Sequence, residues 1–337
     1  MFCGFSCYKI NMTKKKIYFL TGGTGSFSKK FIEILLKKKL AKKIIIYSRD
    51  EYKQFLLQQN HLVKKNSSIF RFQIGDIRDK DRLNFSINED IDFVIHTAAL
   101  KQVPATEYNP FEAIKTNIIG AQNLIEICIK KNIDKVLALS TDKAAAPINL
   151  YGATKLTSDK LFTNANFFKG KKRCKFSVVR YGNVMGSRGS VIPLFIKQKN
   201  DKKIYTITDK NMTRFNITLK ESVQFVNMCL SKMKGGEIFV PKIPSYKILD
   251  LLYAIDKKPK FKVIGIRPGE KLHEEMITES DSINTQEFEK YYVIQPSFRK
   301  PINNLRKIFS YNSHNNKKFL KIEEIKELIQ KSLSDFE

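Results

Sequence analysis

The chain has 337 residues, of which 61 are lysine or arginine and 33 are aspartate or glutamate, so its net charge is +28. No apolar run approaches the roughly 18 residues of a membrane-spanning helix, so we predict no membrane insertion. The basic residues are mostly lysines spread along the whole chain without a nucleic-acid motif. We therefore predict no nucleic-acid partner and expect the field to attract an anionic small molecule.

Residues 1–14 are predicted to be a disordered leader. The segment from Met1 to Asn11 lacks the apolar core of a signal peptide, and Met12 is a second candidate start of translation. The 5 cysteines are scattered without a Cys-x-x-Cys pair. This spacing suits a reducing cytoplasm and predicts neither a disulfide framework nor a metal site.

A dinucleotide-binding motif is predicted at the start of the folded chain. Residues 16–20 form a short buried strand, residues 29–40 form a helix, and the turn between them contains Gly22 and Gly25. Glycines let the backbone approach a pyrophosphate, which then lies at the positive end of the helix. Ser28 stands where the motif usually has a third glycine, and its small volume is expected to preserve binding.

The second strand, residues 43–47, bears on the choice of nicotinamide cofactor. It ends in Ser48, Arg49 and Asp50. A guanidinium suits the 2′-phosphate of NADP, whereas an acidic residue at the strand end holds the ribose of NAD. Because Arg49 precedes Asp50, the sequence favours NADP and leaves NAD open.

The same alternation of strand and helix continues through the first half of the chain. Strands are predicted over residues 69–74, 92–97, 135–139 and 176–180, and a helix over residues 110–131. Asp76 follows the third strand, where its carboxylate either faces the adenine or caps a helix. We therefore predict an α/β fold, a Rossmann-type doubly wound parallel sheet with a smaller mixed α/β substrate-binding region toward the C-terminus.

Candidate catalytic residues follow the strand over residues 135–139. Tyr151 and Lys155 are four positions apart and share one face of a helix, where an ammonium is expected to lower the pKa of a phenol. A phenol tuned in this way can take a proton from a hydroxyl group as hydride leaves the same carbon. Asp142 and Lys143 lie at the same sheet edge; the alternative is a structural ion pair at a helix start.

These motifs together resemble the extended short-chain dehydrogenase/reductases and, more narrowly, the inverting UDP-N-acetylglucosamine 4,6-dehydratases of pseudaminic acid biosynthesis. The similarity runs from about Lys15 to the tail. It is carried by the segments 21–25, 48–53, 99–104, 107–110, 115–118, 140–143, 149–155, 180–183, 212–215 and 266–274. The sharpest discriminator is Asp142-Lys143, because retaining dehydratases typically have Asp-Glu at this place.

The resemblance implies roles for five catalytic residues. Tyr151, helped by Lys155 and the Thr141 hydroxyl, takes the proton of the carbon-4 hydroxyl as hydride passes to NADP. Lys143 then removes the carbon-5 proton, and Asp142 protonates the departing carbon-6 hydroxyl. Hydride returns to carbon 6, so NADP stays bound and is recycled. As a base, Lys143 needs a pKa well below its usual value of about 10.4, whereas the neighbouring Asp142 raises it.

The resemblance also implies binding residues and partners. The cofactor-binding set is Gly22, Thr24, Gly25, Ser26, Phe27, Ser48, Arg49, Asp50, Lys53, Asp76, Ile77, Ala98, Lys101, Asn117, Tyr151, Lys155 and Val184. The substrate-binding set is Lys101, Asn183, Arg188, Arg267 and Glu270, the last two as a clamp on the UDP group. The implied partners are a UDP-sugar and further copies of the chain, as a hexamer or dimer.

The folded chain is predicted to divide into two regions. Residues 15–185, with part of 217–245, form the cofactor domain, and residues 186–216 and 246–337 form the substrate-binding region. The chain departs from the family pattern at Ser28, Gln102, Ala146 and Asn216. Reduced activity is therefore one expectation. The alternatives are a UDP-sugar 4-epimerase, another sugar-nucleotide dehydratase, or a non-catalytic nucleotide-binding protein.

Overall fold

The protein is described from a computed structural model, which covers residues 14–87, 90–185, 191–296 and 308–333. Apart from Lys14, the predicted leader lies outside this part of the chain. Within these ranges no helix combines the length and the apolar character that a membrane span requires.

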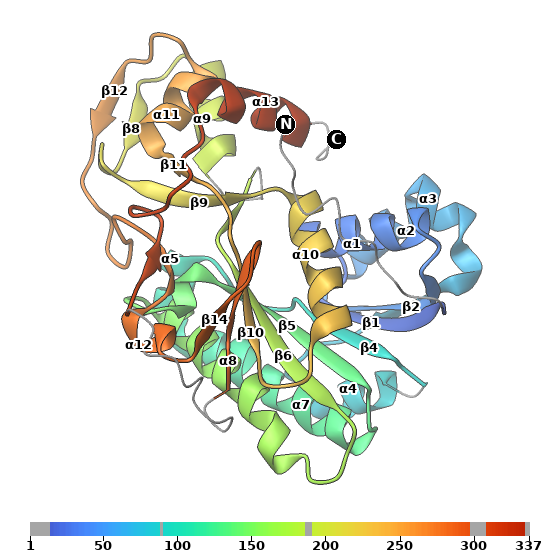
Figure 1. The fold of residues 1–337 in the computed structure, drawn as a ribbon. Coiled ribbons are helices and arrows are strands. Elements are labelled where there is room, and N and C mark those ends of the chain that lie inside the picture. The colour runs from blue at the N-terminus through green and yellow to red at the C-terminus, as the bar shows by residue number, and fades with distance from the viewer. Residues whose placement is uncertain (1–13, 88–89, 186–190, 297–307, 334–337) are drawn as a thin grey trace.

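One nine-stranded sheet organises the molecule (Figure 1), in the strand order β14-β15-β10-β6-β5-β4-β1-β2-β3. The seven strands from β10 to β3 are parallel, whereas β15 and β14 add an antiparallel edge. In chain order the strands are β1 (Lys16–Thr21), β2 (Ala41–Ser48), β3 (Phe70–Ile74), β4 (Phe93–His96), β5 (Lys135–Thr141), β6 (Lys175–Tyr181), β10 (Ile238–Pro241), β14 (Thr285–Glu287) and β15 (Tyr291–Ile294). The 3-2-1-4-5-6 order confirms the predicted doubly wound Rossmann-type sheet.

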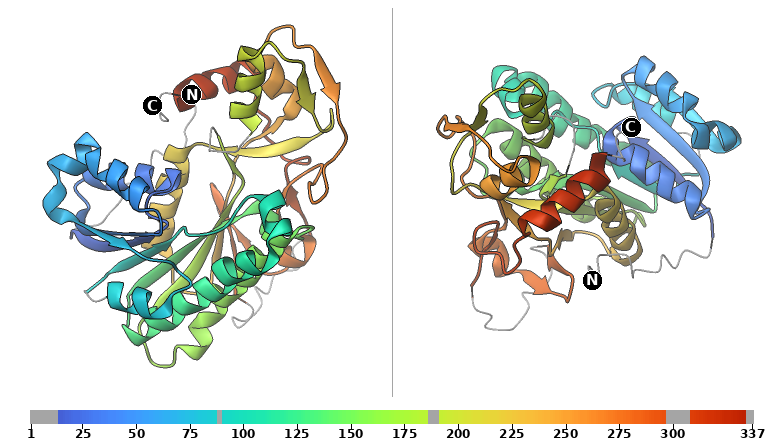
Figure 2. Two further views of the ribbon diagram at one scale, coloured as in Figure 1. Left: turned by 180° about the vertical axis from the view of Figure 1, so that it is seen from behind. Right: turned by 90° about the horizontal axis from the view of Figure 1, so that it is seen from above.

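Helices cover both faces of this sheet, as the two opposite views in Figures 1 and 2 show. One face carries α1 (Ser26–Lys37), α2 (Glu51–Gln59), α3 (His61–Lys65) and α10 (Leu219–Lys232). The other carries α4 (Lys80–Ser86), α7 (Gly120–Lys130) and α8 (Leu150–Phe168). The central strands β1, β4, β5 and β6 are almost wholly buried, because apolar residues face both helical layers.

Two predicted helices differ from the structure in ways that matter for the site. α1 begins at Ser26 instead of residue 29, directly after the glycine turn, and ends before Lys39, whose φ is 53°. The helix predicted over residues 110–131 is divided into α6 (Pro110–Ile114), a π-helical turn (Lys115–Ile119) and α7. The π-helical turn contains Asn117 and is the kind of local widening that often accompanies functional sites.

A second, smaller hydrophobic core lies in the region above the sheet in Figure 1. The elements of this region are β7 (Asn183–Val184), α9 (Val191–Asn200), β8 (Tyr205–Ile207), β9 (Thr213–Ile217), β11 (Ser245–Lys247), α11 (Ile248–Ile255), β12 (Phe261–Val263) and α13 (Ile322–Leu333). The core itself is formed mainly by residues of α9, β8, α11 and α13. Its centre includes Phe195, Leu251 and Ile325, all almost fully buried. The remaining short elements are α5 (Val103–Tyr108), the 3-10 turns Ser67–Ile69 and Asp142–Ala144, β13 (Glu275–Ile277), α12 (Glu279–Ser282) and β16 (Tyr311–Asn312).

The division between the two regions differs from the predicted boundary. β10 belongs to the main sheet and comes from the segment 217–245. However, β14 and β15 also extend the main sheet, although they lie in the segment 246–337 that we assigned to the substrate-binding region. The physical reason is that β15 pairs with β10 and thereby covers an edge whose backbone groups would otherwise lack partners.

Candidate active site

A cavity of about 890 Å³ opens where the parallel strands end, and it joins the glycine turn to the predicted catalytic residues. All the predicted site residues line it except four. Asn117, Arg267 and Glu270 are not in its lining, and Arg188 lies outside the described residues. The topology therefore collects residues from the carboxyl ends of six parallel strands, β1 to β6, into one space, as expected at this edge of such a sheet.

The glycine turn has the geometry that a dinucleotide needs. Gly22 has a φ of +63°, and a Cβ atom there would lie 2.7 Å from Thr97 Oγ1 and 2.9 Å from the backbone nitrogen of Ala98. Gly25 is the N-cap of α1, and as a glycine it has no side chain to accept a hydrogen bond from the first turn of that helix. Its backbone N–H groups therefore point at the cavity with the positive end of the helix dipole, so the residues fit a pyrophosphate.

Ser28 takes the place of the usual third glycine without opening the packing. Its side chain is buried, and its hydroxyl donates to the carbonyl oxygen of Gly22 at 3.1 Å and lies 3.2 Å from Thr97 Oγ1. The serine therefore connects α1 to the ends of β1 and β4. This departure from the family pattern adds hydrogen bonds at a position where a larger side chain would separate helix and strand.

Replacing Gly22 with alanine is expected to weaken dinucleotide binding at least about tenfold and to lower the free energy of unfolding by about 2 kcal/mol or more, because steric overlap adds to backbone strain. Gly170 is the matched control, since its φ is +60° and no atom lies within 4 Å of its added Cβ. Gly170→Ala should cost only the strain, about 1–2 kcal/mol, with unchanged cofactor affinity. Fluorescence titration measures the cofactor affinity, and urea unfolding measures the free energy of unfolding. Equal effects of Gly22→Ala and Gly170→Ala would contradict the steric argument.

The far end of the cavity carries the residues that are predicted to bind the adenosine ribose. Asp50 caps α2 by accepting from the backbone nitrogen of Lys53 at 2.9 Å, and its carboxylate is paired with the Lys53 amine. Arg49 Nη1 lies 3.5 Å from Asp76 Oδ2. Asp76 also binds Arg78, and the N-cap of α4 is Asp79, so the helix-cap alternative for Asp76 is wrong. Asp50 is thus already engaged locally, whereas half of the Arg49 side chain remains exposed to the cavity.

Asn117 lies behind the cavity wall instead of in it. Its side-chain oxygen accepts from the backbone nitrogen of Leu100 at 2.8 Å, and its side-chain nitrogen donates to the carbonyl oxygen of Leu100 at 2.9 Å and to Thr154 Oγ1 at 3.0 Å. With these bonds made, Asn117 is almost fully buried. The predicted direct contact with the cofactor is therefore replaced by a positioning role, in which the π-helical turn holds the loop that contains Lys101 against α8.

Tyr151 lies on the cavity wall at the N-terminus of α8, which Asn149 caps. Burial raises the pKa of Tyr151 to about 12, so the expected lowering by Lys155 is wrong for this state of the protein. The reason is that the Lys155 amine donates to the carbonyl oxygen of Leu139 at 2.8 Å and faces Asp159. The spacing in the sequence placed Tyr151 and Lys155 on one face of the helix, but the Lys155 ammonium is held by the carbonyl oxygen of Leu139 in β5.

The Asp142-Lys143 pair follows β5 in a 3-10 turn. Asp142 is buried, and burial raises its pKa, which favours the protonated carboxyl that a general acid needs. Burial alone would lower the pKa of Lys143, but Asp142 and Glu274 outweigh burial and raise it. The pKa of Lys143 is therefore raised overall. In this structure Lys143 is an ammonium ion, and the lowered pKa that a base needs is not present.

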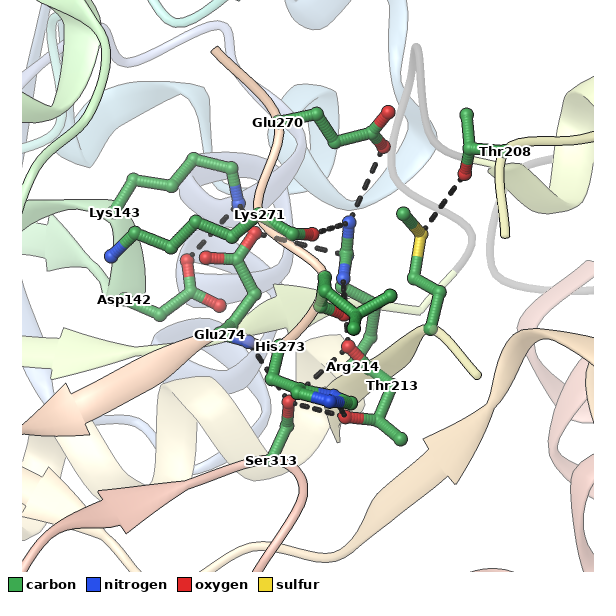
Figure 3. A network of polar contacts seen from close by, with 12 residues as sticks. Asp142, Lys143, Thr208, Thr213, Arg214, Glu270, Lys271, His273, Glu274 and Ser313 are labelled. Atoms are coloured by element: carbon green, nitrogen blue, oxygen red, sulfur yellow. Dashed lines mark hydrogen bonds and ion pairs between the residues drawn. The ribbon is translucent and has the colours of Figure 1, made fainter. Parts of the chain in front are cut away.

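A charged network that the sequence reading did not single out surrounds Lys143 (Figure 3). Lys143 Nζ donates to Glu274 Oε1 at 2.8 Å and to Asp142 Oδ1 at 3.2 Å. Glu274 lies between Lys143 and Arg214, and Arg214 Nη2 also pairs with Glu270 Oε1 at 3.3 Å. Arg214 and Glu274 fall in segments that carry the family resemblance, which was the only sequence signal for them.

The predicted UDP clamp is arranged around this network. Arg267 lies exposed in the loop between β12 and β13, and its carbonyl oxygen accepts from the backbone nitrogen of Glu270 at 3.0 Å. Glu270 Oε2 is buried without a hydrogen-bond partner among the residues described. Glu270 thus contacts Arg214 through one oxygen, and the exposed Arg267 lies three positions before it in the same loop.

The other departures from the family pattern occupy ordinary positions. Ala146 has a φ of 44°, a left-handed conformation that asparagine adopts more easily than alanine. Asn216 is buried in β9, and Gln102 is exposed at the start of α5. No group of three or more histidine, cysteine, aspartate or glutamate side chains in the described ranges could hold a metal ion.

Comparisons with known proteins agree with this geometry. A family model described as "Polysaccharide biosynthesis protein" matches residues 18–296. The chain is 51% identical to the UDP-N-acetylglucosamine 4,6-dehydratase (inverting) of Campylobacter jejuni, over 94% of this chain and 98% of that protein. It is 39% identical to the UDP-glucose 4-epimerase of Rickettsia bellii, over 93% and 95%. Among solved structures, Pen from Bacillus thuringiensis has a TM-score of 0.86 and 39% identity, over 94% of this chain and 99% of that one.

Proposed function

Because the chain belongs to the polysaccharide biosynthesis protein family, we propose that it is an inverting UDP-N-acetylglucosamine 4,6-dehydratase. The observation that carries this proposal is the presence of Tyr151, Asp142 and Lys143 on one wall of a cavity shaped for a dinucleotide. A phenol, a buried carboxyl and an amine are the groups required for oxidation at carbon 4, loss of the carbon-6 hydroxyl and removal of the carbon-5 proton. The 51% identity to a relative of that name supports the assignment.

In the proposed reaction each side chain handles one proton. A nicotinamide cofactor held by the glycine turn and the cavity lining would supply the hydride chemistry at carbon 4 and carbon 6. Tyr151 takes the proton of the carbon-4 hydroxyl, with the Thr141 hydroxyl beside it favouring the phenolate. Lys143, once neutral, takes the proton from carbon 5, and Asp142 gives its proton to the departing hydroxyl.

The product of this sequence is UDP-2-acetamido-2,6-dideoxy-β-L-arabino-hex-4-ulose, because carbon 5 receives a new proton on the opposite face. We place this reaction as the first step toward pseudaminic acid. The cytoplasm is the expected compartment, and a hexamer or dimer is the expected assembly, which light scattering of the purified protein would test.

NADP is the proposed cofactor, tightly bound and recycled. Arg49 and Lys53 line the ribose end of the cavity, and the Asp50 carboxylate is held by Lys53. The guanidinium of Arg49, which is half exposed and lies 3.5 Å from Asp76, is thus the group best suited to a 2′-phosphate. Arg49→Gln is expected to weaken NADP binding at least about tenfold with little change for NAD, as measured by fluorescence titration of each. Equal losses for the two cofactors would contradict the assignment.

Proton NMR of the purified protein with UDP-N-acetylglucosamine and NADP in D₂O tests the function. The expected result is a new 6-deoxy methyl signal, deuterium at carbon 5 and L-arabino couplings. Deuterium with retained configuration would instead indicate a retaining dehydratase. The Rickettsia bellii relative, named a UDP-glucose 4-epimerase, gives the second candidate, which would yield a 4-epimer without loss of water. An unchanged spectrum with NADP bound would favour a non-catalytic nucleotide-binding protein or a different UDP-sugar.

A further inference from the structure

The Lys143 amine is held between two buried carboxylates at the edge of the cavity. The side chains of Asp142 and Glu274 are 1% and 2% exposed, whereas that of Lys143 is 24% exposed and reaches the cavity. Glu274 Oε1 accepts from Lys143 Nζ at 2.8 Å, the shorter of the two contacts. Lys143 and Asp142 both line the space that would hold a substrate, whereas Glu274 is not in the lining and meets that space through Lys143.

Glu274 is fixed from several sides. Its backbone nitrogen donates to Ser313 Oγ at 2.9 Å, and its Oε1 lies 3.7 Å from Arg214 Nε. Arg214 is in turn anchored by the carbonyl oxygens of Leu272 and Lys271, each at 3.0 Å. Glu274 Oε2 is buried and has no hydrogen-bond partner within the described part of the chain. This rigid carboxylate is aimed at Lys143, as Figure 3 shows.

Resting on the proposed dehydratase function, we propose that Glu274 is a positioning residue for the elimination step: it holds the Lys143 amine at the cavity wall and determines the pH at which that amine is free to take the carbon-5 proton. A carboxylate 2.8 Å from an ammonium favours the charged form, so its removal makes the neutral amine available at lower pH. The other charged or titratable groups that face Lys143 are Asp142, Tyr151, Arg214, Tyr246 and Lys271.

In this arrangement each proton of the elimination step has a donor and an acceptor. The Lys143 ammonium first gives one proton to water in the open cavity and becomes an amine. The amine then forms a bond to the carbon-5 proton, and the electron pair of the broken C–H bond moves toward carbon 6 as the C–O bond breaks. The Asp142 carboxyl proton joins the departing hydroxyl, so water is released. Glu274 stays ionised throughout and keeps Lys143 in place.

Glu274→Gln tests the proposal, because glutamine keeps the size and the hydrogen-bonding oxygen but removes the charge. The readout is deuterium incorporation at carbon 5 of UDP-N-acetylglucosamine, measured against pH with the NADP-loaded protein. We expect the acid limb of the profile to move to lower pH by about one unit or more, with a plateau at least about tenfold lower. Glu274→Asp keeps the charge but shortens the side chain. The acid limb of the pH profile should therefore stay at the same pH while the plateau rate falls.

Two controls separate positioning from a merely structural role. Glu275→Gln alters the next residue of β13, whose carboxylate faces Lys271, Asp281 and Glu279, and should leave both limb and plateau unchanged. In a Lys143→Met background, Glu274→Gln should have no further effect on turnover, because Glu274 acts through Lys143. The proposal would be overturned if the acid limb of the pH profile did not move in Glu274→Gln. It would also be overturned if Glu274→Gln lowered turnover further in the Lys143→Met background.

A substrate-free measurement keeps this inference distinct from the proposed function. If the wild-type protein does not dehydrate UDP-N-acetylglucosamine, the proposed function fails. The role of Glu274 is then decided by NMR titration of ¹³C-labelled lysine, with the Lys143→Met variant assigning the signal. A lower pKa of Lys143 in Glu274→Gln supports control of the amine by Glu274, and an unchanged pKa refutes it.

Discussion

Replacement of Lys143 by arginine is expected to reduce dehydration by about 10²–10⁴-fold while leaving the fold intact. A guanidinium can keep ion pairs with Glu274 and Asp142, which the amine now contacts at 2.8 and 3.2 Å. However, arginine does not lose its proton in proteins and cannot act as a base at carbon 5. Deuterium incorporation at carbon 5 of UDP-N-acetylglucosamine measures the loss directly.

The matched control for this change is Lys271→Arg. The Lys271 amine donates to the carbonyl oxygen of Ala145 at 2.8 Å, beside the same network, but it is not in the cavity lining. This variant should dehydrate the substrate at nearly the wild-type rate. A Lys143→Arg protein that folds, binds the nicotinamide cofactor and still turns over fully would remove Lys143 from the mechanism, and the base would have to be sought elsewhere.

Replacement of Tyr151 by phenylalanine is expected to lower hydride transfer from carbon 4 by about 10²–10⁴-fold, because the ring is kept and only the proton-accepting oxygen is lost. The appearance of the reduced nicotinamide in single-turnover absorbance measurements reports this step. Tyr205→Phe is the control, since it removes a buried hydroxyl that binds Asp256 in the smaller region, remote from the cavity. Full hydride transfer in Tyr151→Phe would rule out the phenol as the base.

The pH dependence of the same step has a defined sign. Burial raises the pKa of Tyr151 to about 12, so the phenol keeps its proton through neutral pH. Hydride transfer in the wild-type protein is therefore expected to become faster as the pH rises through the alkaline range, where the phenolate becomes more populated. The Tyr151→Phe protein should show no such rise, because it has no phenol to titrate.

Local patterns in the chain account for much of the fold and for the positions of most candidate site residues. Buried strands alternate with amphipathic helices, and Gly22 and Gly25 occur between the first strand and helix, so the parallel sheet and its cofactor end were predictable. The i, i+4 spacing of Tyr151 and Lys155 placed both on one face of α8. Asn117 was recognised as part of the family pattern, but its binding to Leu100 depends on the π-helical turn.

Contacts between distant segments could not be read in this way. Glu274 is 131 positions from Lys143, and only the docking of β13 beside the turn after β5 brings the two side chains to 2.8 Å. The same is true of β14 and β15, whose place in the main sheet follows from pairing with β10. Short strands with little periodicity carry no signal of which sheet they will join.

The sequence by itself determined which chemical groups are present and which of them share a strand end or a helix face, because these follow from the local geometry of the backbone. The tertiary structure alone decided the charge states of those groups. Burial raises the pKa of Tyr151, against the lowering that the spacing to Lys155 suggested. For Lys143 the neighbouring Asp142 already suggested a raised pKa, and in the folded chain Asp142 together with the distant Glu274 outweighs the lowering by burial. A pKa depends on solvent exclusion and on every charge nearby in space, and both exist only once the chain has folded.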